Sequence, residues 1–210
     1  MHTIAIVDDH QIVREGLKGF LDKRPDYRVI ATASSINELF VMLEHSRPDL
    51  LILDLKLQDG DGVSAALKVK RLYPALKIVL LSGFIEPDMA TEAKCIGVEG
   101  YLLKTVNLNK LTTAIDRIIT GDTVYDPAVD AQASQTIPLA LQSLSSQERE
   151  LIRLMALGMT NKEIAATMNI AEKTARNYTS RLFKKINVEN RSEAVGYYMR
   201  HCKLPSDRVE

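Results

Sequence analysis

The sequence predicts an α/β protein with a five-stranded, doubly wound parallel sheet, joined to a smaller all-α domain of four helices. Over residues 1–121, short apolar runs alternate with stretches of helical period, which is typical of repeated βα units. After Gly121 the composition changes, and no Lys or Arg occurs before Leu144. Helix-period segments without strand-like runs follow. These observations divide the chain into a sheet domain at 1–121, a linker at 122–144 and a helical domain at 145–210.

The expected elements follow from the apolar runs and from the residues that stop helices. Pro48 and Pro74 lie just past two expected helix ends, and Gly97 and Gly121 follow two others. Strands are expected near 3–8, 27–33, 50–54, 77–82 and 100–103. Helices are expected between them near 11–23, 35–45, 62–73, 86–96 and 108–120. The C-terminal helices are expected near 147–157, 161–168, 172–186 and 192–201.

Composition limits the class of protein. The chain has 210 residues and is 46% hydrophobic, which is enough for packed cores in a soluble globular protein. The longest apolar runs have the length of strands, and no basic or long apolar segment precedes the first strand, so we expect a cytoplasmic protein without membrane contact. Cys95 and Cys202 lie far apart and without CxxC or Cys/His spacing, which favours reduced thiols over a disulfide or a zinc site.

Acidic residues follow two of the predicted strands. Asp8 and Asp9 end the first strand, and Asp54 ends a strand of apolar residues. In a doubly wound sheet the ligand site lies outside the carboxyl ends of the strands, where Ser82 and Lys104 are also expected. Carboxylates can hold Mg²⁺, and one of them can act as a nucleophile toward phosphorus. Lys104 and Mg²⁺ would then offset phosphoryl charge, and the Ser82 hydroxyl could hydrogen-bond the bound group.

The last third of the chain has the spacing of a helix-turn-helix. A short helix capped by Thr160 or Asn161 is followed by a turn at Asn169, and a second helix begins near Glu172. The inward stripe of that second helix is expected to contain Ala175, Thr179, Leu182 and Ile186. Its outward stripe is expected to contain Lys173, Arg176, Asn177, Ser180 and Lys184.

The outward stripe suits a helix that lies in the major groove of DNA. Arg and Asn can pair with base edges, while Lys173, Lys184 and Lys185 can neutralise phosphates. Residues 145–210 carry a net charge of +4 and residues 1–121 a net charge of −1, so the basic charge is collected where DNA would bind. A solvated helix face is the simpler alternative for any such run. The turn before the helix favours the DNA-binding interpretation.

At the acidic residues the chain resembles the receiver domains of bacterial two-component response regulators, which have a flavodoxin-like fold. The resemblance implies that Asp54 accepts a phosphoryl group. It implies that Asp9, Asp54 and the Lys56 carbonyl bind Mg²⁺, and that Asp8 helps through water. It further implies a switch formed by Ser82 and Tyr101, although a Tyr at a strand end is often only a half-buried core residue. The matching segments are Ile6-Val7-Asp8-Asp9-His10, Leu53-Asp54-Leu55, Asp61-Gly62, Leu81-Ser82-Gly83 and Gly100-Tyr101-Leu102-Leu103-Lys104.

The C-terminal third resembles the LuxR-type DNA-binding domain, in the segments 144–150, 158–165 and 172–174. Together with the receiver it is similar to the NarL/FixJ subfamily from about residue 3 to 202. The resemblance implies that Lys173, Arg176 and Asn177 lie at or near bases and that Thr174 contacts a phosphate. It also implies that the last helix can form the dimer contact on DNA. The alternative for that helix is that Ala194, Val195, Tyr198 and Met199 simply close the small core.

We therefore expect a phosphorylation-controlled transcriptional regulator that catalyses only its own phosphotransfer and hydrolysis. Its expected partners are a sensor histidine kinase, double-stranded DNA and a second copy of the chain, with RNA polymerase as a further candidate. One alternative is a hydrolase of the aspartyl-phosphate type, which places a second Asp where this chain has Lys56. The other is a DNA-binding regulator with a receiver-like dimerisation domain that does not use phosphorylation. Its pocket would be expected to have lost an acid or the Lys.

Overall fold

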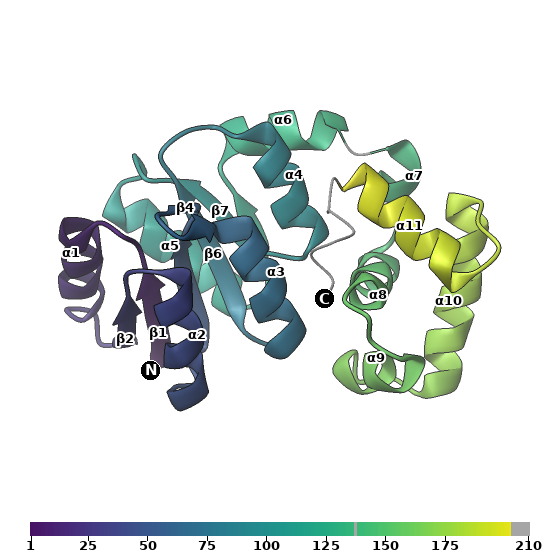
Figure 1. Ribbon diagram of the computed structural model, residues 1–210, viewed down its shortest axis with the longest axis horizontal. Coiled ribbons are helices and arrows are strands. Elements are labelled where there is room, and N and C mark those ends of the chain that lie inside the picture. The colour runs from purple at the N-terminus through teal and green to yellow at the C-terminus, as the bar shows by residue number, and fades with distance from the viewer. Residues whose placement is uncertain (137, 203–210) are drawn as a thin grey trace.

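The computed structural model of the chain describes residues 1–136 and 138–202. The N-terminal part is a parallel sheet with helices on both faces, and the C-terminal part is all-helical (Figure 1). Both features of the predicted fold class are therefore confirmed. Residues 203–210 of the predicted helical domain lie outside the described residues.

The parallel sheet has the strand order β2-β1-β3-β6-β7-β8. Five of these strands match the predicted ones closely. The sixth strand, β8, lies at the edge beside β7 and was not predicted, because two half-buried residues form no recognisable apolar run. Beyond the end of β3, a short antiparallel ribbon forms from β4 (Lys56–Leu57) and β5 (Gly60–Asp61). The sheet strands are β1 (His2–Val7), β2 (Tyr27–Ala33), β3 (Leu50–Asp54), β6 (Lys77–Ser82), β7 (Gly100–Leu103) and β8 (Val124–Tyr125).

Helices cover the two faces of the sheet, and each face has its own hydrophobic core. Leu17 of α1 and Ile115 of α5 pack on one face with strand residues such as Ile52. Leu39 of α2 and Leu67 of α3 pack on the other face, together with residues of α4. The central strands are apolar on both sides because both sides are covered. The helices are α1 (Gln11–Leu21), α2 (Ile36–His45), α3 (Gly62–Leu72), α4 (Pro87–Cys95) and α5 (Leu108–Ile119).

The segment between the two parts contains regular structure as well as turns. After β8, the chain forms α6 (Pro127–Thr136) and the short helix α7 (Leu139–Gln142). Helix α6 runs along α4, with Val129 fully buried and an ion pair between Lys94 and Asp130. The low content of basic and large apolar residues, which made this segment resemble a linker, does not prevent it from packing.

The C-terminal part consists of α8 (Ser146–Ala156), α9 (Asn161–Thr167), α10 (Glu172–Ile186) and α11 (Arg191–His201). Capping boxes begin α8 and α9, because Ser145 pairs with Glu148 and Thr160 pairs with Glu163. Thr160 is therefore the cap of α9. Asn169 has φ of 52°, which places it in the left-handed turn that the sequence predicts between α9 and α10.

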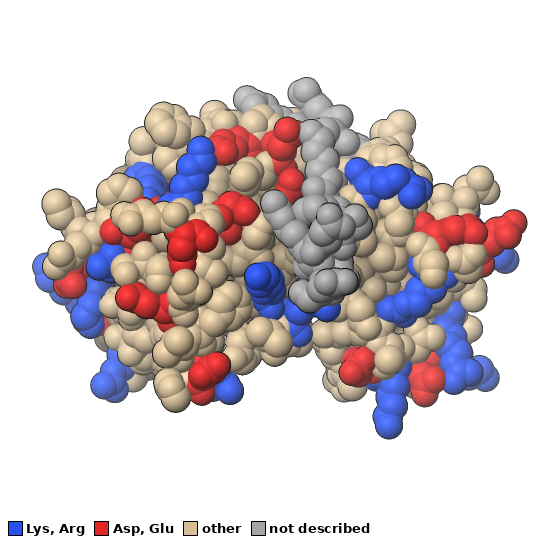
Figure 2. All heavy atoms as spheres, in the orientation of Figure 1, with Lys and Arg blue, Asp and Glu red and all other residues tan. Residues whose placement is uncertain are grey.

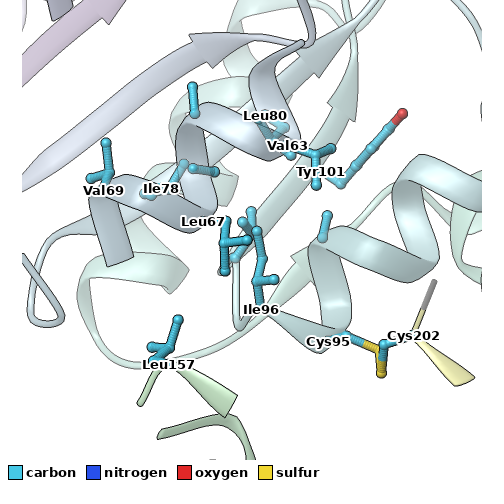
Figure 3. Close-up of a cluster of buried hydrophobic side chains, with 14 of the residues drawn as sticks. Val63, Leu67, Val69, Ile78, Leu80, Cys95, Ile96, Tyr101, Leu157 and Cys202 are labelled. Carbon is cyan, nitrogen blue, oxygen red and sulfur yellow. A yellow bond between two sulfur atoms is a disulfide. The ribbon is translucent and has the colours of Figure 1, made fainter. Parts of the chain in front are cut away.

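The two parts of the chain share one apolar core. Buried residues of α3 and α4 belong to the same hydrophobic cluster as Leu157 at the end of α8 (Figure 3). Tyr198 of α11 belongs to this cluster as well. Cys95 and Cys202 are joined by a disulfide at this contact, with their Cα atoms 5.8 Å apart. The prediction of reduced thiols is therefore wrong for this structure. The two cysteines are 107 residues apart in sequence, and only the docking of the domains brings them together.

Candidate functional site

The acidic residues meet at one edge of the parallel sheet. Val7 of β1 lies beside Leu53 of β3, so the residues that follow these two, Asp8 and Asp54, emerge next to each other. Both side chains are buried, with only 1% of Asp8 and 4% of Asp54 exposed. Two buried carboxylates this close would repel each other unless a cation lies between them.

Lys104 provides a positive charge between the two acids. Its Nζ lies 2.7 Å from Asp54 Oδ2 and 2.8 Å from Asp8 Oδ2. Burial raises the pKa of Asp54, although the hydrogen bond from Lys104 acts in the opposite direction. Burial alone would lower the pKa of Lys104, but its bonds to the two carboxylates raise it above the ordinary value. Lys104 therefore stays charged, and it is directed at the oxygens of Asp54.

The acidic pocket has the donor set of a site for a hard cation. Ligand atoms of Asp8, Asp9, His10 and Asp54 all lie within 4.8 Å of one another. Carboxylate oxygens are the ligands that Mg²⁺ prefers. Asp8 Oδ2 and Asp9 Oδ1 are buried oxygens, and their nearest side-chain neighbours are Lys104 Nζ at 2.8 Å and His10 Nδ1 at 2.6 Å. The Lys56 backbone nitrogen lies 3.3 Å from Asp54 Oδ1, so the backbone at Lys56 borders the same pocket.

Some residues at the pocket were not selected from the sequence. The backbone N–H of His10 donates to Asp8 Oδ1 over 2.8 Å, and its ring Nδ1 lies 2.6 Å from Asp9 Oδ1. Arg14 of α1 donates to the carbonyl oxygen of Asp8 over 2.5 Å. His10 directly follows the two acids in sequence, so its place at the pocket could have been predicted from that adjacency. Arg14 gave no such signal, because only the turn into α1 brings it back to the end of β1.

The predicted switch residues Ser82 and Tyr101 are both buried. The Ser82 hydroxyl donates to the carbonyl oxygen of Phe84 over 2.5 Å and accepts from the Phe84 N–H over 3.2 Å. Tyr101 is fully buried, and its ring stacks on Tyr125 with centroids 6.0 Å apart. Burial raises the pKa of Tyr101 to about 12. The Tyr101 hydroxyl is buried without a hydrogen-bond partner among the described residues.

The pocket is connected to the rest of the molecule through α4. Lys56, two residues beyond Asp54, is exposed at its side chain and forms an ion pair of 2.8 Å with Glu86. Glu86 is the N-cap residue of α4, and the other end of that helix is Cys95. Phe84, whose backbone contacts the Ser82 hydroxyl, has 75% of its surface exposed. One helix therefore begins at the mouth of the pocket and ends at the contact between the domains.

The predicted DNA-binding stripe lies on the exposed side of α10. The inward residues Ala175, Leu182 and Ile186 are buried, and Thr179 donates to the Ala175 carbonyl oxygen. Lys and Arg side chains are seen on the C-terminal domain along the edge where α10 lies (Figure 2). Thr174 is half-buried, and the exposed predicted residues are Lys173, Arg176, Asn177, Ser180, Lys184 and Lys185.

Two residues of this helix form ion pairs within the chain. Arg176 pairs with Glu172 one turn earlier, with 2.6 Å between the charged atoms. Lys185 Nζ lies 2.6 Å from Glu148 of the α8 capping box. Lys185 is therefore tied to α8, whereas the structure records no ion pair for Lys173 or Lys184 among the described residues. The start of α10 is exposed and lacks a side-chain cap, because Ala171 occupies the N-cap position.

Two families match the chain in sequence. Residues 4–116 match the family described as "Response regulator receiver domain". Residues 142–198 match the family described as "Bacterial regulatory proteins, luxR family". Among the described residues, no helix has both the length and the apolar character needed to cross a membrane.

Known proteins resemble the chain over almost its whole length. The response regulator VraR of Staphylococcus aureus is 31% identical over 201 residues, which cover 94% of this chain and 96% of VraR. A structure of the RcsB response regulator of Salmonella typhimurium is 26% identical with a TM-score of 0.61, covering 94% of this chain and 98% of RcsB. An RcsB–DNA complex is 27% identical with a TM-score of 0.60, covering 95% of this chain and 98% of that one.

Proposed function

The chain belongs to the response regulators of bacterial two-component systems, in which a receiver domain controls a LuxR-type DNA-binding domain by phosphorylation, and we propose that Asp54 is its phosphoryl acceptor. The single observation that supports this role most strongly is the position of Lys104, whose Nζ lies 2.7 Å from Asp54 Oδ2 and 2.8 Å from Asp8 Oδ2. Each residue alone is unremarkable. A half-buried lysine directed at a buried carboxylate, at the ligand edge of a doubly wound sheet, is the arrangement that phosphoryl transfer needs.

The transfer step follows from this geometry. A carboxylate oxygen of Asp54 attacks phosphorus, the bond to the donor nitrogen or oxygen breaks, and the donor leaves with its electron pair. Lys104 offsets the negative charge on the phosphoryl oxygens, which is the main contribution a protein makes to this chemistry. We propose that Asp8, Asp9, Asp54 and the Lys56 carbonyl hold Mg²⁺, which when bound adds further positive charge beside the phosphoryl group.

Phosphorylation of Asp54 would be relayed by the buried Ser82 and Tyr101. The Ser82 hydroxyl is held by the backbone of Phe84, and a phosphoryl oxygen would compete for that hydroxyl. Tyr101 belongs to the neighbouring strand β7, and its hydroxyl lacks a hydrogen bond among the described residues. Because Phe84 lies in the loop that leads into α4, a change in the Ser82 hydroxyl would move that loop.

The output is binding to double-stranded DNA through α10. Lys173, Arg176 and Asn177 are proposed to lie at base edges, with Thr174, Ser180, Lys184 and Lys185 at or near phosphates. The exposure of this stripe and the resemblance to a regulator solved with DNA support the proposal. Two chains would pair through α11, as two-fold DNA sites require.

The remaining partners follow from the same chemistry. A sensor histidine kinase would supply the phosphoryl group, and RNA polymerase would receive the signal at the promoter. Because its target is DNA, we place the protein in the cytoplasm. The catalytic activity of the receiver would be limited to its own phosphotransfer and hydrolysis. The proposed domains remain 1–121 for the receiver, 122–144 for the linker and 145–210 for DNA binding.

Acetyl phosphate tests the acceptor role. The full chain is incubated with acetyl phosphate and Mg²⁺, and its intact mass is measured. Wild type should gain one phosphoryl group, and Asp54→Asn should gain none. Asp26→Asn makes the same chemical change at an exposed position and should behave as wild type. No gain in wild type, or an equal gain in Asp54→Asn, would overturn the assignment.

The DNA proposal is tested with duplexes that the wild-type protein selects from a random pool. Arg176→Ala and Asn177→Ala should each weaken binding by roughly tenfold or more, because a bidentate base contact contributes about 1–3 kcal/mol. Lys23→Ala removes an exposed charge from the receiver, away from α10, and serves as the control. If both stripe variants bind as tightly as the control at several salt concentrations, α10 is not the reading helix.

A further inference from the structure

We propose that Cys95 and Cys202 form a thiol-redox site, and that its oxidation fixes the C-terminal domain on the receiver. The two sulfurs are bonded in this structure, and they come from different domains. In a cytoplasmic protein a disulfide is usually transient and redox-sensing rather than structural. The effect of this site on DNA binding rests on the proposed function, whereas the effect on docking does not.

The position of each cysteine makes the bond a clamp between two helix ends. Cys95 is the last residue of α4, and Cys202 directly follows α11 (Figure 3). Both residues are buried, at 5% and 0% exposure. Their Cα separation of 5.8 Å is within the range that a disulfide spans without moving the backbone. The docked arrangement therefore presents the two thiols to each other ready to be oxidised.

Other contacts converge on the same turn and would hold it when the sulfurs are reduced. The Tyr198 hydroxyl of α11 donates to the carbonyl oxygen of Cys95. Arg153 of α8 donates to the carbonyl oxygen of Ile96 over 3.3 Å, and its side chain crosses Gly97. A Cβ at Gly97 would lie 2.4 Å from Arg153 Cδ, so the absent side chain makes room for this crossing. Non-covalent docking thus aligns the cysteines before any bond forms.

The clamp lies at the far end of the helix that begins at the pocket. Glu86 occupies the N-cap position of α4 and forms an ion pair with Lys56, and Cys95 ends the helix at the contact between the domains. A phosphoryl group on Asp54 would move the loop before α4 and so weaken docking at its other end. A covalent bond at Cys95 opposes that separation, because it ties the end of α4 to the end of α11. The redox site would therefore override the phosphorylation signal.

The reaction needs a two-electron oxidant, for which we propose a peroxide or a small disulfide. With hydrogen peroxide, one thiolate attacks oxygen and the O–O bond breaks, giving a sulfenic acid and one water after protonation. The second thiolate then attacks that sulfur, the S–O bond breaks and a second water leaves. Two sulfurs are oxidised by one electron each, and the peroxide is reduced to two waters. With a small disulfide, two thiol exchanges give the same product and two small thiols.

Oxidation would also cover a surface that the DNA-bound form needs. Tyr198 of α11 faces the receiver in the docked state and is 6% exposed. If α11 forms the dimer contact on DNA, this helix cannot serve the receiver and a second chain at once. The oxidised protein would then remain a compact monomer with an exposed but unpaired α10.

The test uses the full chain without DNA or phosphoryl donor, so a failure of Asp54 phosphorylation would not affect it. Protein reduced with dithiothreitol is divided, and one half is treated with hydrogen peroxide or oxidised glutathione. Free thiols are counted by alkylation and mass spectrometry, and the linked peptides are identified. Amide hydrogen exchange is then compared in α11 and in residues 96–103. Cys202→Ser and Cys95→Ser receive the same treatments.

Oxidation should remove both thiols from wild type and link Cys95 to Cys202 within one chain. Exchange in α11 should slow by roughly tenfold or more on oxidation, because opening of the docked state is restricted. Neither Ser variant should show that change. A link only between chains, two thiols that persist, or equal exchange in the reduced and oxidised wild type would each overturn the proposal. The wild-type comparison stands even if a variant fails to fold.

DNA binding provides a separate second measurement. On a duplex selected by the reduced protein, the oxidised wild type should bind at least roughly tenfold more weakly, and dithiothreitol should restore binding. Cys202→Ser should bind equally under both conditions. If oxidation links the cysteines and slows exchange but leaves DNA binding unchanged, the clamp stands and the proposed role of α11 in pairing is wrong.

Discussion

At the scale of single residues, the pocket could be predicted because strand ends are visible in the sequence. Asp8, Asp54 and Lys104 each follow an apolar run, and parallel strands bring such positions to one edge. The role of Arg14 could not be read in the same way. Its contact with the Asp8 carbonyl depends on the angle at which α1 leaves β1, and no residue pattern encodes that angle.

Lys104→Met should slow phosphorylation strongly. The substitution keeps the length of the side chain but removes the only charge within bonding distance of both Asp54 and Asp8 among the described residues. Losing one such donor usually costs about 100-fold or more in rate. The rate of mass gain with acetyl phosphate measures the effect, and Lys110→Met on the exposed side of α5 is the control. Rates that agree within a factor of two would contradict the role of Lys104.

Phe84 and Lys56 should set the lifetime of the phosphoryl group. They lie two residues beyond Ser82 and Asp54, where Phe84 is 75% exposed and Lys56 pairs with Glu86. Phe84→Ala and Lys56→Ala open the path of an attacking water, so we expect several-fold faster loss of the phosphoryl group. The decay of phosphorylated intact mass after removal of acetyl phosphate measures it. Unchanged decay in both variants would show that water reaches Asp54 from another side.

At the scale of elements, helices with strong caps were predictable and short packed pieces were not. Thr160 and the turn at Asn169 could be located because side-chain caps and left-handed turns favour few residue types. Strand β8 and helices α6 and α7 could not, because they are short or weakly amphipathic and depend on the surfaces they cover. The segment between the domains therefore looked like a linker in composition alone.

Glu148→Gln should destabilise the C-terminal domain in a way that depends on pH. Glu148 is buried at the start of α8, where bonds from Lys185 and Ser145 more than offset the effect of burial and lower its pKa below the ordinary 4.5. A lowered carboxyl pKa stabilises the fold at neutral pH, and that contribution is lost as pH falls through the folded value. The variant should lose about 1 kcal/mol at pH 7 and less near pH 4. Thermal unfolding at both pH values, with the exposed Glu189→Gln as control, measures it.

At the scale of the whole molecule, the docked arrangement was beyond prediction. Arg153, Tyr198 and Cys202 appear in the sequence as ordinary helix residues, and they meet the turn at 95–97 only because α8 and α11 pack against the receiver. The disulfide was missed for the same reason. Cysteine spacing in sequence carries no information about contacts that two separately folded domains make.

Gly97→Ala should loosen docking in the reduced protein. The new Cβ would meet Arg153 Cδ at 2.4 Å, so Arg153 must leave its position over the turn. Both Gly97 and Gly121 have positive φ, at 77° and 108°, but a Cβ at Gly121 meets nothing within 4 Å. Gly121→Ala therefore carries the backbone strain without the clash. Faster hydrogen exchange in α11 of Gly97→Ala than of Gly121→Ala would show weaker docking, and equal exchange would contradict it.

If the domains must separate before the chain binds DNA, the apolar core that they share limits how tightly the resting protein binds. A chain that must separate its domains before it binds has an apparent affinity equal to its intrinsic affinity multiplied by the separated fraction. If the docked form outnumbered the open form by about a hundred to one, binding would look about a hundredfold weaker than the helix itself allows. Each apolar side chain added to that core would then lower the apparent DNA affinity of the unphosphorylated protein, and each one removed would raise it.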